Sequence, residues 1–211
     1  MRDLALPAGH FEDLAQQRHA AKLGIGVFLA SEALLFAGLF ALFAAYQTEY
    51  PDAFHEGVLH NTKVLGSVNT GILLLSSTLV ALSVHAARLA RRRNAAVLLA
   101  LTIALGLTFL TIKLVEYGTH FREGIFPGGA GSFFTDHADA GLPLFWTLYY
   151  VVTGLHAVHV TVGLTVLGFM LAGVLRGSIA PPVTYKLEIG ALYWHLVDVI
   201  WIFVWPLFYL A

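Results

Sequence analysis

Five long apolar runs, separated by shorter polar stretches, divide this chain. They cover about residues 23–46, 64–87, 95–117, 142–175 and 187–210. A helix needs about 20 mostly apolar residues to cross the hydrocarbon core of a bilayer, and each run is long enough. No internal repeat or long linker interrupts the pattern. We therefore predict an all-α fold: a single membrane domain, residues 1–211, built as an integral bundle of five transmembrane helices.

The composition points to the same class of protein. Hydrophobic residues make up 58% of the chain, whereas Asp, Glu, Lys and Arg together make up only 12%. Soluble domains carry roughly twice that charge. The formal net charge of -1 offers no basic surface, so we expect no nucleic-acid partner. The absence of cysteine excludes disulfides and thiolate metal sites.

Lysine and arginine are concentrated in alternate polar stretches, which predicts the orientation. If the helices alternate, one side carries nearly all of the cations outside the runs, and the other side carries only Lys63 and Arg122. By the positive-inside rule, the N-terminus is cytoplasmic and the C-terminus external. The polar N-terminal residues 1–17 do not resemble a signal peptide, so we expect the first run to be retained. The cations of the first side are Arg2, Arg18, Lys22, Arg88, Arg91, Arg92, Arg93, Arg176 and Lys186.

Titratable residues interrupt the apolar runs at similar depths. The segment WHLVDVIWIF holds His195 and Asp198, the fourth run holds His156 and His159, and the first holds Glu32. A helix rises about 1.5 Å per residue, which puts four of them near the bilayer midplane and His156 one turn nearer the outside. A charged residue at a helix centre costs about 2.5 to 3.5 kcal/mol to insert. We therefore predict that the five side chains face one another in a buried polar cluster.

Three interpretations of this cluster remain open from the residues alone. It could be a hydrogen-bonded group that fixes helix register, or part of a proton path. It could also bind a metal, because His156 and His159 share one helical face and the other three residues could add ligands. The chain shows no phosphate-binding loop or nucleophile motif, and no ligand set typical of haem.

Two further pairs of residues attract attention. Lys113 and Glu116 lie three residues apart near the outer end of the third run, where we expect an interfacial pair with a snorkelling lysine. Trp194 and Trp201 lie too deep in the fifth run for an interfacial belt. We expect them to take part in buried aromatic packing, within this chain or against a partner.

Stretches from all five runs resemble subunit III of haem-copper oxidases, the cytochrome c oxidase subunit 3 family. They are FLASEALLFAGLF, NTGILLLSS, IKLVEY, TGLHAVHVTVG and YWHLVDVIWIFVWPLFYL. The resemblance implies an all-helical subunit without a redox cofactor of its own. Such a subunit binds catalytic subunit I, which sits with subunit II and holds haem and copper. The family's role is to support proton uptake, to hold structural phospholipid and to protect the enzyme during turnover.

The resemblance also bears on the candidate residues. Positions typical of the family are Glu32, Glu116, His156, His159, His195 and Asp198, with Trp194 and Trp201 beside them. This favours a structural or proton-related cluster, and we expect no catalytic, cofactor-binding or metal-binding residue in this chain. Longer members have seven helices, and this chain starts at the third helix of that plan. Lys113 stands where many members carry an uncharged polar residue.

We therefore expect a non-catalytic subunit III of a proton-pumping cytochrome c oxidase in aerobic respiration, multi-pass in a bacterial inner (cytoplasmic) membrane among membrane lipids. The alternative is the equivalent subunit of a quinol oxidase or of a nitric oxide reductase complex. A stand-alone membrane metalloenzyme or transporter is the hypothesis from a different class.

Overall fold

The computed structural model describes residue 9, residues 11–136 and residues 140–210, and all regular structure in these ranges is helical. Five helices are long and apolar enough to cross a membrane, which confirms the predicted all-α bundle of five transmembrane helices. The elements are α1 (Leu14–Glu49), α2 (Pro51–His60), α3 (Lys63–Arg88), α4 (Arg92–Arg122), the 3-10 turn η1 (Pro127–Gly129), α5 (Phe133–Asp136), α6 (Leu142–Arg176) and α7 (Tyr185–Tyr209).

Most of the spanning helices extend beyond the apolar runs. Helix α1 begins at Leu14, well before the predicted start at residue 23, because the Asp13 side chain accepts a hydrogen bond from the Gln16 backbone N–H at 2.7 Å and caps the helix. The apolar pattern also missed α2, a short helix with Pro51 in its first turn. A hydropathy window finds the part of a helix that lies in lipid and overlooks its polar turns.

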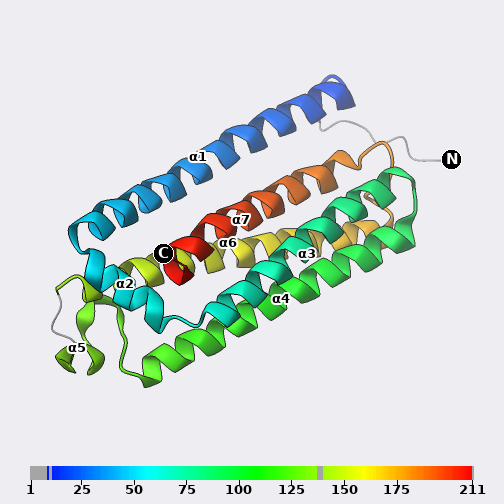
Figure 1. Cartoon of the computed structure of the whole chain (residues 1–211). Helices are drawn as coiled ribbons and strands as arrows, with labels where there is room; N and C mark the ends of the chain where they lie inside the picture. The colour runs from blue at the N-terminus through cyan, green and yellow to red at the C-terminus, as the bar shows by residue number, and fades with distance from the viewer. Residues whose placement is uncertain (1–8, 10, 137–139, 211) are drawn as a thin grey trace.

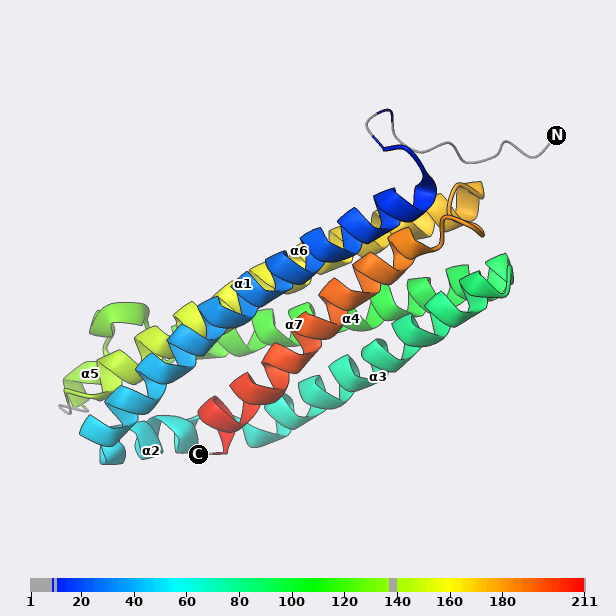
Figure 2. The same cartoon turned by 90° about the horizontal axis from the view of Figure 1, so that it is seen from above.

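The helices form a bundle in which α7 is central and α1 peripheral. Figures 1 and 2 show α3 and α4 as one antiparallel hairpin, α6 and α7 as another, and α1 lying along α6 and α7. In the most apolar window of α7, 56% of the residues are buried, against 11% in α1. The first residues of α1 and the last of α7 lie at opposite ends of the bundle (Figure 1), while the side of the membrane that each end faces stays a prediction.

Trp194 of α7 holds the centre of the bundle together. Its side chain is completely buried, and its Nε1 donates a hydrogen bond to Ser76 Oγ of α3 at 3.0 Å. Glycines make room for the ring on two other helices, because a Cβ atom on Gly106 of α4 or Gly163 of α6 would come within 2.8 Å of it. The indole ring of Trp194 therefore lies in a contact shared by four helices, α3, α4, α6 and α7. Trp201 is likewise fully buried, packed edge-on against Phe109.

This packing predicts that Gly106→Leu destabilises the bundle by about 1–3 kcal/mol, the usual cost of overpacking a filled core. Thermal unfolding in detergent measures the effect. Gly118→Leu is the matched control, because Gly118 lies on the same helix and nothing lies within 4 Å of a Cβ added there. Equal melting temperatures for the two variants would contradict the proposed fit around Trp194.

Candidate functional site

Glu32 and His159 form a polar pair between α1 and α6. Glu32 Oε2 lies 2.8 Å from His159 Nε2, and His159 Nδ1 lies 2.8 Å from the Leu155 carbonyl oxygen. A carbonyl can only accept, so Nδ1 carries a hydrogen. The Nε2 contact then needs one further proton, on the imidazole or on the carboxyl group. In either arrangement the pair shares one proton and has no net charge, which suits its half-buried position between the helices.

The other contacts that attach α1 to the rest of the bundle are mostly between aromatic rings. Only Phe36 and Phe43 of α1 are buried, and Phe36 packs edge-on against the His159 ring, with centroids 5.3 Å apart. Tyr193 of α7 donates a hydrogen bond to the His159 carbonyl oxygen at 3.2 Å. The Glu32–His159 pair is therefore the main polar attachment of α1.

His195 and Asp198 lie in a second group, between α7 and α3. The Ser77 hydroxyl lies 2.6 Å from His195 Nδ1. Asp198 is 3% exposed, and within the described part of the chain neither of its carboxylate oxygens has a hydrogen-bond partner.

His156 lies apart from both groups, in an aromatic environment. It is completely buried against the rings of Phe109 and Trp201, with centroids 5.6 and 5.0 Å away. Neither of its ring nitrogens has a hydrogen-bond partner among the residues the structure covers.

The five residues that we predicted to meet in one cluster thus lie in three places, and no hydrogen bond or ion pair in the described ranges joins the three. The helical rise gives a position along each helix axis. It carried no information on the direction in which each side chain leaves its helix. Among the described residues, no three His, Asp or Glu side chains gather closely enough to hold a metal ion.

Lys113 and Glu116 form the most completely buried charged pair among the residues that the structure describes. Lys113 Nζ lies 3.2 Å from Glu116 Oε2, and the two side chains are 3% and 2% exposed. Lys113 also donates hydrogen bonds to the hydroxyls of Tyr149 and Tyr209 at 3.0 and 2.8 Å. These hydroxyls in turn donate to Glu116 Oε1, each at 2.6 Å. One closed network therefore links α4, α6 and α7.

The expectation of a snorkelling lysine in this pair is wrong, while the depth of the pair relative to the membrane interface stays a prediction. Lys113 does not reach toward an interface, because two phenol hydroxyls and a carboxylate satisfy its ammonium group inside the bundle, and the rings of Tyr149 and Trp201 lie within 4.9 and 5.6 Å of it. The tyrosines that make this possible were missed in the sequence. Each lies in a different apolar run, where a tyrosine is ordinarily a packing residue, so only their juxtaposition reveals the role.

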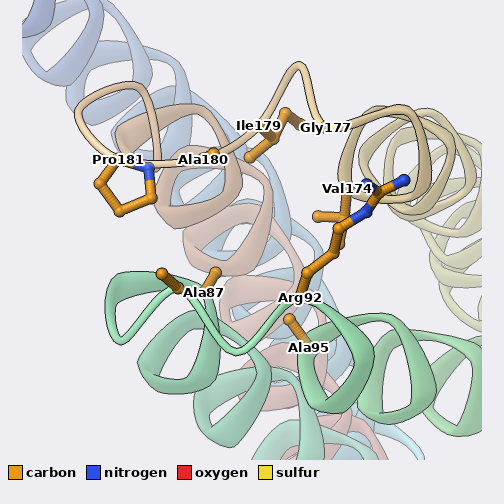
Figure 3. A pocket seen from close by; sticks show the side chains of 9 residues that line it. Ala87, Arg92, Ala95, Val174, Gly177, Ile179, Ala180 and Pro181 are labelled. Atoms are coloured by element: carbon orange, nitrogen blue, oxygen red, sulfur yellow. The ribbon is translucent and has the colours of Figure 1, made fainter. Parts of the chain in front are cut away.

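Figure 3 shows a cavity of about 230 Å³ at the end of the bundle where α3 ends and α4 begins. Its walls are mostly apolar, with Ala87, Val174 and Pro181 among them, and Arg92 is its one charged residue. Arg92 lies beside Gly177, the C-terminal cap of α6, where a cation is favoured by the helix dipole. We interpret this cavity as a packing feature of the helix ends, separate from the polar groups above.

Comparison with known proteins adds an independent line of observation. A family model described as cytochrome c oxidase subunit III matches residues 2–211. Quinol oxidase subunit 3 of Bacillus spizizenii is 30% identical over 192 residues, covering 89% of this chain and 85% of the relative. Cytochrome c oxidase subunit 3 of Synechocystis is 32% identical over 192 residues, covering 89% and 74%. The subunit of the same name from Gallus gallus is 29% identical over 207 residues, covering 95% and 72%.

The Lys113 network predicts that a single variant is less stable than the double variant that removes both charges. Lys113→Met leaves the Glu116 carboxylate buried without its cation, and we expect a loss of about 3–5 kcal/mol in stability. The double variant Lys113→Met/Glu116→Gln removes both charges and should recover part of that loss. Thermal unfolding of the three proteins in detergent tests this. A double variant less stable than Lys113→Met alone would contradict the coupling.

Proposed function

Since the family model spans nearly the whole sequence, this chain belongs to the cytochrome c oxidase subunit III family, and we propose that it is the non-catalytic third subunit of a proton-pumping cytochrome c oxidase. In this proposal it works in aerobic respiration beside catalytic subunit I and subunit II, which hold the haem and copper. The family match over residues 2–211 is the observation that carries the proposal.

The internal polar contacts support a role without electron transfer by this chain. Glu32, His159, Lys113 and Glu116 are all engaged with one another or with neighbouring helices. Side chains used in this way stabilise helix packing, which is what a supporting subunit needs. Membrane lipids and structural phospholipid are further proposed partners, because long apolar helix faces remain exposed in the bundle.

The Glu32–His159 pair is the feature best suited to support proton uptake. It shares one proton between α1 and α6, and both side chains keep some exposure, 17% for Glu32 and 12% for His159. A polar group of a neighbouring subunit that packs against this partly exposed pair can exchange a proton with it, whereas the closed Lys113 network offers no such access. We propose that the pair retains a proton near the entry side of the neighbouring catalytic subunit.

The proposed location is a bacterial inner membrane, with the N-terminus in the cytoplasm. The arginines and lysines outside the apolar runs support that orientation. The second candidate function is the equivalent subunit of a quinol oxidase, favoured by a relative of that name at 30% identity.

Purification after mild detergent extraction tests the assembly. We expect the tagged chain to bring with it a haem-bearing catalytic subunit and a copper-bearing subunit II, detected by optical and metal analysis. A haem-bearing partner whose subunit II lacks copper and which oxidises quinol would favour the quinol oxidase. Purification with a nitric oxide reductase would overturn both candidates.

A second test asks whether the titratable groups of this chain stabilise the enzyme or take part in oxygen reduction. Glu32→Gln and Asp198→Asn remove titratable groups but keep side-chain shape, so initial oxygen reduction by the assembled enzyme should stay within about twofold of wild type, under about 0.5 kcal/mol in the barrier. We expect Glu32→Gln to lose activity faster during sustained turnover. Glu49→Gln is the control, because Glu49 is an exposed carboxylate at the end of the same helix. Assembled variants that lack haem or copper spectra from the start would contradict the proposal.

A further inference from the structure

A second cavity opens between α1, α3 and α7, on a different side of the bundle from the Glu32–His159 pair. Its volume is about 390 Å³, within the range of roughly 300–1,000 Å³ typical of ligand sites. Lys22 and Arg88 line it at the end where α3 finishes and α7 begins, and His195 lines it further along α7. Between them the wall is apolar, formed by residues such as Ala81, Val84 and Leu192.

The charged end of this cavity has an excess of positive charge. Arg88 Nε donates a hydrogen bond to Glu188 Oε1 at 3.0 Å, which fixes the guanidinium and leaves its two terminal nitrogens without a partner among the described residues. The Lys22 ammonium, which is exposed, has no described partner either. Two cations and one carboxylate leave one positive charge uncompensated, which suits a singly charged anion.

His195 provides a second polar contact deeper in the cavity. It lies seven residues after Glu188, about 10 Å along the helix axis. Ser77 holds its Nδ1 at 2.6 Å, and with the serine hydroxyl as donor the Nε2 atom carries the hydrogen. No described residue accepts from that Nε2, so it is available to an acceptor in the cavity.

We propose that this cavity binds one anionic phospholipid, with its phosphate between Lys22 and Arg88. An ester carbonyl then accepts from His195 Nε2, and an acyl chain lies along the apolar wall between α3 and α7. Basic pockets between transmembrane helices are typical sites for anionic lipid head groups. A free phosphate ion would match the two cations but would gain nothing from the apolar wall. The proposal rests on the lipid-holding part of the proposed function and names its site.

Native mass spectrometry of the assembled, detergent-purified complex titrated with phosphatidylglycerol tests the site. We expect Lys22→Gln/Arg88→Gln to weaken binding of the first lipid by roughly tenfold or more, because each cation near an anionic head group contributes substantially. Arg91→Gln/Arg93→Gln is the matched control: it removes the same charge at the same end of the bundle, but neither residue lines this cavity. That control should bind like wild type.

A second variant leaves the charges intact. Ala81→Phe fills the exposed apolar wall and should also weaken the first binding step, whereas phosphatidylcholine and inorganic phosphate should not displace phosphatidylglycerol from wild type. Equal affinities for Lys22→Gln/Arg88→Gln and its control would overturn the site, as would displacement by inorganic phosphate. A wild-type complex that binds no phospholipid at all would contradict the lipid-holding part of the proposed function instead.

Discussion

An apolar solvent gives buried polar side chains no partners except one another, and this constraint organises the bundle. Lys113 and Glu116 illustrate it most fully, because their charges compensate one another and both groups form hydrogen bonds with two tyrosines that come from two other helices. Asn61 follows the same rule near one end of the bundle, where its Nδ2 donates to the Phe208 carbonyl oxygen at 2.9 Å. Each such bond joins residues distant in sequence. The polar positions therefore determine which face of each helix turns inward, and the apolar positions fill the remaining space.

The same constraint explains why α1 differs from the other helices. Helices α3, α4, α6 and α7 share the Trp194 contact and the Lys113 network, whereas α1 contributes two buried phenylalanines and one polar pair. The strength of that pair depends on its proton. If the proton left, the Nε2 lone pair of His159 would face the Glu32 carboxylate directly, and an attraction between two helices would become a repulsion. The attachment of α1 and the protonation of this pair are thus linked through one hydrogen bond.

The sequence predicted the five membrane-spanning helices, but not the short helix α2, because length and apolarity are properties of a single segment. The depth of Glu32, His159, His195 and Asp198 in the bilayer stays a prediction of the same kind. The sequence could not predict that His156 faces Phe109 and Trp201 while His159 faces Glu32, since that depends on how helices rotate against each other. Lys113 shows the limit most clearly. A lysine near the end of a run usually snorkels, and its burial depends on tyrosines whose position is fixed only by the assembled fold.

The similarity to both quinol and cytochrome c oxidase subunits follows from the same physical demand. Buried polar side chains, such as Lys113 with Glu116 and Trp194 with Ser76, need partners inside the bundle whichever molecule delivers electrons to the neighbouring subunit. The chain is 30% and 32% identical to relatives of the two kinds, so overall identity does not separate them. Contacts with other subunits and with lipid are made on the outward faces instead, where Lys22 and Arg88 line the cavity described above. The properties that distinguish this chain from its relatives should accordingly lie on those faces.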